Sequence, residues 1–477
     1  MRDFLKKSGL IGLSVLLGVL LSVHLSAIAN QESKQTIPYE DLQLLASVFG
    51  KIKSNYVEEV SDEKLIREAI NGMVRGLDPH SEFLVGKELE DLKISTQGKF
   101  GGLGIEVTTE DGVVKVVSPI EDTPAFRAGI QAGDLIIKID ETVTRGLPLT
   151  KAVEMMRGKP GTRVKLTVAR KDEPAPLEFN IKREIINVKS VIAKIIEPNY
   201  GYIRVRNFQE RTGEEVANAV RAFYQEAPLK GLILDVRSDP GGLLEQAVAV
   251  SAVFLPREQL IVYTQGRVAD ARMELKSRRS DYIRNPIAKD YIADLPEAIK
   301  IVPMVVLIDA GSASAAEIVA GALQDHKRAT LMGAPSFGKG SVQTVMKVDD
   351  QHMLKLTTAH YFTPSGRSIQ AKGIDPDILI DDGRDILRVR EANLQSHLET
   401  PNNGETTKAA PTEENDNEEE GKSEEKPRIK PVRFEFGGEK DFQLEQALNQ
   451  LKGLPVLLTR ENAEEDEAAA PKDTTKE

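Results

Sequence analysis

The chain offers few side chains that could act as a nucleophile. Its 477 residues include no cysteine, so thiol chemistry, cysteine metal sites and disulfides are all excluded. The six histidines form no His-Glu-x-x-His pair, and no Gly-x-Ser-x-Gly motif is present. We therefore expect no metal and no cofactor. The activated nucleophile that remains is a serine deprotonated by a neutral lysine.

Lys339 is the candidate base. It lies in the glycine-rich segment Gly333–Gln343, GAPSFGKGSVQ, and no acidic residue occurs between Thr330 and Val348. A lysine base must lower its pKa from ~10.4 to about 7 to 8, which disfavours its charged form by roughly 4 kcal/mol. Burial without a carboxylate partner has that effect. The local sequence is compatible with such an environment, although a lysine without nearby acids is common.

Two serines compete for the role of nucleophile. Ser312 and Ser314 both follow the apolar run at 301–309 and precede a segment with helical character. A hydroxyl placed there would face the positive end of the helix. However, Ser314-Ala-Ala-Glu317 also matches a capping box, in which the serine only satisfies a backbone donor. The pattern alone leaves the choice of serine, and the choice between capping and catalysis, open.

The elements that would position these residues are two strand–turn–helix units. Apolar runs at 230–237 and 301–309 are each followed by a turn of small residues and then by a helical segment. This order predicts a parallel sheet covered by helices. Because ligands collect at the carboxyl ends of parallel strands, the turns SDPGG and AGSAS mark the candidate site.

A smaller β-rich domain precedes this sheet. Residues 96–184 alternate short strands, turns and two short helices, and begin with the glycine-rich Gly101–Ile105. Glycines let successive amides turn toward one point, where the terminal carboxylate of a peptide could bind. An ordinary glycine turn is the alternative on spacing alone.

The ends of the chain have different compositions. Residues 1–30 combine basic residues, an apolar run and Ala27-Ile28-Ala29, which is typical of an export signal, with an uncleaved membrane anchor as the alternative. Residues 405–425 hold nine acids and two lysines, and residues 461–477 hold seven and two, so the rest of the chain is close to neutral. A near-neutral body gives no reason to expect nucleic-acid binding.

Three strings resemble the carboxyl-terminal processing proteases, which are secreted serine peptidases. They are GSASAAEIVAGALQD at 311–325, GAPSFGKGSVQ at 333–343 and TPSGRSIQAKGIDPDI at 363–378, and the match extends from about residue 40 to 380. The resemblance implies Ser314 as the nucleophile, since the interval to the lysine selects it over Ser312. It also implies Lys339 as the general base and Gln343 as its assistant. The oxyanion would be held by amides of Gly241 or Gly242 and of Ala315.

The segment 101–140, with GGLGIEV and SPIEDTPAFRAGIQAGDLIIKID, resembles a circularly permuted PDZ domain of bacterial proteases. That likeness implies a carboxylate-binding loop at Gly102, Leu103, Gly104 and Ile105, with Val153 to Met156 on the groove helix. The chain departs from the family in reading RSDPGG where an asparagine-rich version is more frequent, and in AAE where a second serine is common. These departures leave the oxyanion donor undecided.

We therefore expect a multidomain α/β and α+β protein with a crotonase-like, parallel-sheet protease core, an inserted PDZ domain and an N-terminal helical subdomain. It would act as an endopeptidase outside the cytoplasm, in the periplasm or cell envelope, with attachment to the inner membrane by its N-terminal segment as an alternative to cleavage of that segment. Its partners would be unfolded or C-terminal tails of envelope proteins, with an adaptor and a second copy as further candidates, but no nucleic acid. The expected parts are a signal peptide (1–29), a helical subdomain (38–95), the PDZ domain (96–184), the protease core (185–384), an acidic disordered linker (385–432), a C-terminal segment packing on the body (433–460) and an acidic tail (461–477).

The sequence leaves three other interpretations. Gly333–Lys339 matches a phosphate-binding loop, but position 340 is glycine instead of the serine or threonine that would hold magnesium. Ser336 and Lys339 imitate the Ser-x-x-Lys motif of penicillin-binding enzymes, although Gly338 and Gly340 disfavour the helix that this motif opens. A non-catalytic PDZ scaffold of the cell envelope is the alternative from a different functional class.

Overall fold

The computed structural model describes residues 38–171, 173–383, 389–401, 436–438 and 440–460. The expected export signal and acidic tail lie outside these ranges. Within them, no helix combines the length and the apolar character needed to span a bilayer. The chain divides into two compact units, Met1–Gly72 and Met73–Glu477.

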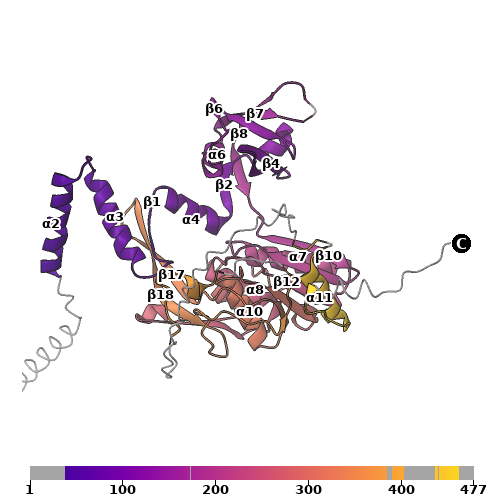
Figure 1. The fold of residues 1–477 in the computed structure, drawn as a ribbon. Helices are drawn as coiled ribbons and strands as arrows, with labels where there is room; N and C mark the ends of the chain where they lie inside the picture. The colour runs from indigo at the N-terminus through magenta and orange to yellow at the C-terminus, as the bar shows by residue number, and fades with distance from the viewer. Residues whose placement is uncertain (1–37, 172, 384–388, 402–435, 439, 461–477) are drawn as a thin grey trace, which may run out of the picture. The chain divides into compact units, whose positions relative to one another are not determined.

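The first unit is helical in its described part. It contains α2 (Tyr39–Asn55) and most of α3 (Asp62–Arg75), at the indigo end of the ribbon (Figure 1). The helical spacing of apolar residues predicted both helices. No residue of α2 is buried, so its apolar residues remain exposed. They include Leu42, Leu45, Val48 and Ile52.

The first complete element of the second unit is a strand, which the expected helical subdomain at 38–95 did not include. Strand β1 (Glu82–Val85) pairs antiparallel with β18 (His352–Phe362), and α4 (Lys87–Gln97) follows it. Leu84 is buried in this pairing. The prediction failed here because a four-residue strand is held by its partner, which lies some 270 positions further along the chain.

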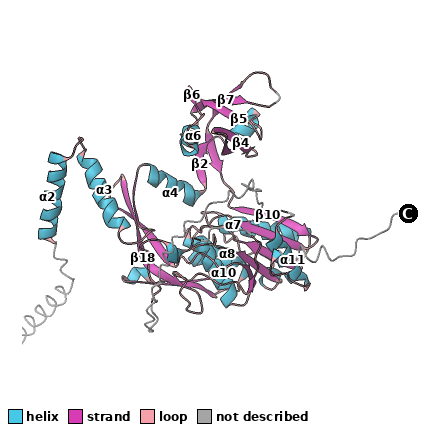
Figure 2. Ribbon diagram, in the orientation of Figure 1, coloured by secondary structure: helices cyan, strands magenta, loops and turns pink. Residues whose placement is uncertain are grey.

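The β-rich domain is built on one main sheet (Figure 2). Its strand order is β3-β4-β5-β7-β8, with β6 paired to β5, while β2 and β9 form a separate two-stranded ladder. The domain has its own core, which includes Val116, Ile136 and Leu166. Its elements are β2 (Lys99–Gly102), β3 (Ile105–Glu110), β4 (Val113–Pro119), α5 (Pro124–Ala128), β5 (Leu135–Ile139), β6 (Thr142–Val143), α6 (Leu149–Met156), β7 (Arg163–Ala169), β8 (Leu177–Lys182) and β9 (Glu184–Asn187).

The predicted parallel sheet is confirmed. Strands β11, β12, β15, β16 and β19 pair in parallel in that order, and β10 adds an antiparallel edge. The helices that follow the first strands are α7, α8 and α10, as Figure 2 shows over this sheet. The bounds are β10 (Val191–Glu197), β11 (Tyr200–Val205), α7 (Thr212–Glu226), β12 (Gly231–Asp235), α8 (Leu244–Phe254), β15 (Met304–Ile308), α10 (Ala315–Asp325), β16 (Thr330–Gly333) and β19 (Ile378–Leu379).

Both faces of this sheet are buried. Successive side chains of a strand point to opposite faces, so Leu232 and Leu234 pack in the cluster of α7, α8 and α10, while Ile233 packs with Phe442 on the other face. That second face is covered by α11 (Phe442–Lys452), which the periodicity of Asp441–Leu451 predicted. Burial on both faces explains why these strands are continuous apolar runs in the sequence.

A buried ion-pair network fixes α11 to the sheet. The guanidinium of Arg237 donates to the carboxylate of Asp235 at 2.7 Å and to that of Asp441 at 2.6 Å, with all three side chains inaccessible to solvent or nearly so. Asp441 also accepts from the Leu444 amide as the N-cap of α11. The network thus links the turn after β12 to the last described helix.

A second, antiparallel sheet completes the unit. It contains β1, β18, β13 (Leu260–Gly266) and β14 (Glu274–Lys276), with β17 (Ser341–Lys347) paired to β18. Residues 389–401 correct the expected linker at 385–432, because Glu391 in η3 (Glu391–Asn393) is fully buried and accepts from Gln370 and His80. The acidic part of that linker lies outside the described residues. Short helices at Ala269–Ala271 (η1), Arg279–Tyr282 (α9) and Glu297–Lys300 (η2) occupy the connections.

Candidate active site

The turns after β12 and β15 meet at the carboxyl ends of these parallel strands. The two strands are direct neighbours, with Asp235 opposite Leu307. A Cβ atom at Gly241 would lie only 2.8 Å from the Cβ of Ser314 and 2.9 Å from the amide nitrogen of Ala315. Gly241 also has φ of 94°, which disfavours any other residue. Glycine is therefore required for the two turns to pack together.

Ser314 lies at the tip of the turn between β15 and α10. Its backbone has φ of 53° and ψ of −113°, a conformation that costs a non-glycine residue about 1 to 3 kcal/mol. Its hydroxyl makes no cap hydrogen bond, while its backbone N–H donates to the Glu317 carboxylate at 2.8 Å. The capping hydrogen bond from the Ser314 amide to the Glu317 side chain is thus present, and the Ser314 hydroxyl is left for another role.

The rival serine is occupied. Ser312 is fully buried, and its hydroxyl donates to the Val236 carbonyl at 2.8 Å and accepts from the Asp309 amide at 3.0 Å. These bonds join the two turns. Ser312 is therefore a structural residue in this arrangement.

Lys339 lies in the loop between β16 and β17. Burial, together with repulsion from Lys355, lowers the pKa of its amine to about 8, although Glu391, Glu317 and Asp78 act to raise it. In the described part of the chain the amine makes no ion pair, which is the environment that a neutral lysine needs.

Glu317 connects the nucleophile turn to the lysine loop. One carboxylate oxygen accepts from the backbone amides of both Ser314 (2.8 Å) and Lys339 (2.9 Å). The other oxygen accepts from the Ser336 hydroxyl at 2.5 Å and from the Gly338 amide at 2.7 Å. Burial raises the pKa of Glu317 to about 7 although all four hydrogen bonds act to lower it. This single carboxylate holds the backbones of Ser314 and Lys339 together.

Tyr361 of β18 also contacts the loop that carries Lys339. Its hydroxyl donates to the Lys339 carbonyl oxygen. Burial raises the pKa of this phenol, while a hydrogen bond with the Ser314 side chain acts to lower it. No hydrogen bond between the Ser314 hydroxyl and the Lys339 amine is found among the described residues.

Gln343 does not contact the Lys339 amine through a hydrogen bond in the described structure. Its amide nitrogen donates to the hydroxyls of Ser341 at 3.0 Å and Thr357 at 3.1 Å. Thr357 in turn donates to Asp78, whose other donors include the Ser81 hydroxyl. Gln343 is thus held in place by the two strands β17 and β18.

The three candidate oxyanion amides are not equivalent. The amide of Gly241 donates to the Asp239 carboxyl group at 2.8 Å, so it is already used. Among the described residues, no acceptor binds the amides of Gly242 or Ala315, and Ala315 opens α10. The free donors are therefore those of Gly242 and Ala315, not Gly241.

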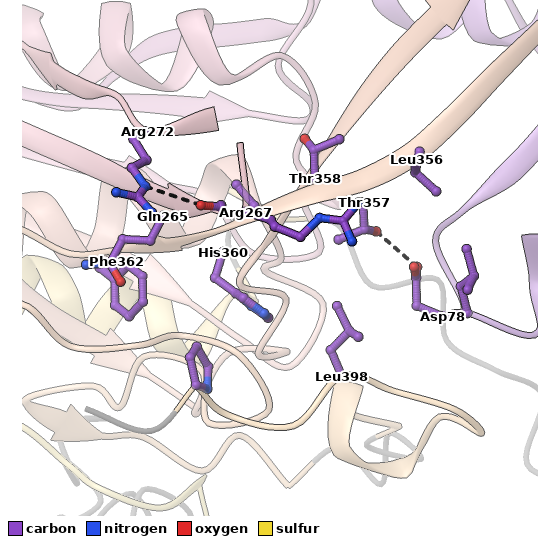
Figure 3. Close-up of a pocket in the computed structure, with 14 residues that line it drawn as sticks. Asp78, Gln265, Arg267, Arg272, Leu356, Thr357, Thr358, His360, Phe362 and Leu398 are labelled. Carbon is purple, nitrogen blue, oxygen red and sulfur yellow. Dashed lines mark hydrogen bonds between the residues drawn. The ribbon is translucent and has the colours of Figure 1, made fainter. Parts of the chain in front are cut away.

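Two cavities flank this region. One of about 480 Å³ is lined by Lys339, by the polar residues His80, Ser238 and Asp309, and by apolar or small residues, among them Ala313, Phe337 and Pro240. The other, of about 900 Å³, lies along β18 and includes neither Ser314 nor Lys339 (Figure 3). Its lining includes Thr357, which is also the hydrogen-bond partner of Gln343, together with Arg267 and Arg272. The first cavity is the one that opens at the candidate base.

The predicted carboxylate-binding loop follows β2. Gly102 ends that strand, Leu103 is buried, Gly104 has φ of 79°, and Ile105 begins β3. The carbonyls of Leu103 and Gly104 accept from the Ala125 and Ile120 amides at 2.9 Å, so the loop is fixed from one side. On α6, Met156 is buried and Val153 packs against the same core.

The sequence did not reveal the roles of Glu317, Tyr361 or Asp239. Glu317 was visible as the partner in a capping box, but its contact with the lysine loop crosses more than 20 positions. Tyr361 lies in an apolar strand and had no local signal. His326 could have served as a base, but its Nε2 atom contacts the Leu260 carbonyl at the opposite end of α10 from Ser314.

We predict that Glu317→Gln destabilises the protein by about 3 kcal/mol, because the new NH2 group faces N–H donors that then lose their acceptor. Thermal unfolding followed by circular dichroism measures the change. Glu226→Gln, at an exposed position near the end of α7, is the matched control and should unfold like the unmodified protein. Equal stability of the two variants would contradict the bridging role of Glu317.

Comparison with known proteins identifies the family. Residues 199–380 match the model of peptidase family S41, residues 101–182 match the PDZ domain, and residues 20–87 match the N-terminal domain of the activating protease CtpB. A solved photosystem II D1 C-terminal processing protease is 27% identical, with a TM-score of 0.39, over 71% of this chain and 92% of its own.

Two curated relatives cover most of the chain. The carboxy-terminal processing protease CtpA of Bacillus subtilis is 34% identical over 74% of this chain and 72% of its own length. The carboxy-terminal-processing protease of Bartonella bacilliformis is 43% identical over 80% of this chain and 86% of its own. The chain therefore belongs to the carboxy-terminal-processing proteases, which are serine-type peptidases of family S41.

Proposed function

We propose that this protein is an exported endopeptidase that cleaves other envelope proteins at or near their C-terminal tails, with Ser314 and Lys339 as a catalytic dyad. The observation that carries the dyad is the Glu317 carboxylate oxygen shared by the Ser314 and Lys339 amides. The lowered pKa of Lys339 supports the same assignment. We further propose that the core is crotonase-like and that the PDZ domain is circularly permuted. An adaptor and a homo-oligomer stay predictions from the sequence.

The reaction proceeds through an acyl-enzyme. The Ser314 hydroxyl attacks the scissile carbonyl carbon while its proton passes to the Lys339 amine. The amides of Gly242 and Ala315 stabilise the oxyanion. The tetrahedral intermediate then expels the amine of the C-terminal fragment, which takes the proton from Lys339. A water molecule, deprotonated by Lys339, then attacks the acyl carbon. The bond to Ser314 breaks, the acid product leaves, and the Ser314 oxygen takes the proton back from Lys339.

Gln343 supports the base in this proposal. Its amide nitrogen is held by Ser341 and Thr357, which leaves its carbonyl oxygen as the acceptor that can orient a protonated Lys339. The 480 Å³ cavity beside Lys339 accommodates a substrate side chain, with Ala313, Phe337 and Pro240 as apolar contacts and His80, Ser238 and Asp309 as polar ones.

The PDZ domain selects the substrate tail. Its loop Gly102–Ile105 receives the terminal carboxylate, and the tail pairs with the edge of β3 beside α6. The positive φ of Gly104 and its close approach to Thr123 support a loop of defined shape. A tail captured in this way gives the core an unstructured segment to cut.

We expect Ser314→Ala and Lys339→Ala each to lower kcat/KM on an unfolded protein substrate by at least about a thousandfold, because nucleophile and base act as one unit. Ser312→Ala is the control: it loses stability with its two hydrogen bonds but keeps the nucleophile. The assay uses protein lacking residues 1–29. Full cleavage by a folded Ser314→Ala variant would refute the dyad, and a non-catalytic scaffold would show no cleavage in any form.

The rate should rise with pH toward a plateau above about 8, since only the neutral Lys339 amine accepts a proton and burial lowers its pKa to about 8. Below that value kcat/KM should fall about tenfold per pH unit. Lys355→Met removes the positive charge that acts on Lys339, so the midpoint should move to higher pH. A midpoint unaffected by Lys355→Met would show that burial alone sets it.

Gly104→Ala should abolish the preference for substrates with a free terminal carboxylate. Its Cβ would lie 2.3 Å from the Thr123 Cβ, so the loop must move. Gly146→Ala is a matched control, because Gly146 has nearly the same φ of 78° but open space around its Cβ. The measurement is the ratio of cleavage rates for one peptide as free acid and as amide. An unchanged ratio in Gly104→Ala would exclude this loop from tail recognition.

A further inference from the structure

Asp239 connects the two turns of the site through its side chain and its backbone. Its carboxyl oxygen Oδ1 accepts from the Gly241 amide at 2.8 Å, and its carbonyl oxygen accepts from the Ala313 amide at 2.9 Å. One residue therefore fixes the turn that presents the Gly242 amide and also the turn that presents Ser314. This position belongs to the turn at 237–242, RSDPGG.

The Asp239 carboxyl group is sealed inside the protein. The residue has no exposed surface, and its Oδ2 atom is buried without a hydrogen-bond partner among the described residues. Because Oδ2 is inaccessible, it cannot touch a substrate, so any influence on the reaction must pass through the turns.

The charged groups around Asp239 act on its ionisation in opposite directions. Two carboxylates act on it, those of Asp235 and Asp309, and one guanidinium, that of Arg204. Arg204 forms its ion pair with Asp235 at 3.3 Å. Arg237, the other buried cation of this region, pairs with Asp235 and Asp441. Burial raises the pKa of Asp239 well above its usual value, against the Gly241 hydrogen bond and the Arg204 charge, which lower it, and the two carboxylates raise it further.

An ionised Asp239 would also oppose catalysis. Its negative charge would lie one peptide away from the Gly241–Gly242 unit, where the amides of Gly242 and Ala315 must stabilise a developing negative charge. In a buried site of low polarity such a repulsion is strong. A neutral carboxylic acid keeps the hydrogen bond to the Gly241 amide without that repulsion.

We propose that Asp239 is a positioning residue that functions as a neutral carboxylic acid, holding the Gly241–Gly242 turn against the Ser314 turn, and that its ionisation disables the oxyanion site at alkaline pH. The effect on rate rests on the peptidase activity proposed above. The protonation state itself does not, and it is tested separately.

The first experiment compares the alkaline limbs of the rate profiles. In the unmodified enzyme, kcat/KM should decline by about tenfold per pH unit once Asp239 ionises. In Asp239→Asn the amide oxygen still accepts from Gly241 and no charge can form, so the ratio of the rate at alkaline pH to the rate at pH 8 should be higher. Asp294→Asn, which changes an exposed aspartate paired with Arg221, is the control and should keep the limb of the unmodified enzyme.

The second experiment needs no activity. In a Ser314→Ala background, the unfolding temperature is followed against pH with Asp239 and with Asn at 239. An aspartate whose pKa is raised in the folded state loses stability as pH rises from its unfolded value toward the folded one, and no further above it. The difference in favour of Asn should therefore grow with pH above about 4 and then level.

The outcomes separate the two proposals. A growing stability difference without any peptidase activity would retain neutral Asp239 and refute only the proposed function. Identical pH dependence of stability with Asp and Asn at 239 would overturn the neutral acid. Identical alkaline limbs, or a folded Asp239→Asn enzyme without activity while Asp294→Asn is active, would overturn the positioning role.

Discussion

The site depends on one buried carboxylate. Glu317 lies one turn into α10, and its two oxygens receive four donors from the Ser314 turn and from the loop that carries Lys339. Placing a carboxylate in a fully buried position is costly, and the raised pKa of Glu317 reflects this cost. The hydrogen bonds offset it only if both loops keep their positions. The strained backbone of Ser314 is maintained by the same contact, since its amide is one of the donors.

The parallel sheet explains why such a carboxylate can serve both loops. Direct pairing of β12, β15 and β16 brings the segments that follow these strands to the same edge. Small residues then determine how closely the segments approach. A Cβ atom at Gly241, for example, would lie only 2.8 Å from the Cβ of Ser314. On the other face, Arg237 links the turn after β12 to Asp441 of the C-terminal segment. The turns are therefore fixed from within the sheet and from α11.

Several parts of this arrangement were predictable. The apolar runs followed by helical segments predicted the parallel sheet. The helical periodicity of apolar residues at 441–451 predicted α11. The strand at 82–85 and the ordered segment around Glu391 were missed because their stability comes from distant partners, β18 and the pair Gln370 and His80. Local propensity contains no information on such contacts. The choice between Ser312 and Ser314 likewise depended on a distant contact, because the Ser312 hydroxyl donates to the Val236 carbonyl.

The sequence by itself determined the chemical options: without cysteine or a metal motif, a serine and an unpaired lysine were the candidates, and family-specific strings indicated which ones. The tertiary structure decided what each group can do. The Gly241 amide donates to Asp239, the amides of Gly242 and Ala315 have no acceptor within the described ranges, and the Lys339 amine is desolvated. Hydrogen-bond partners and desolvation depend on atoms brought together from distant parts of the chain, so only the folded structure specifies them.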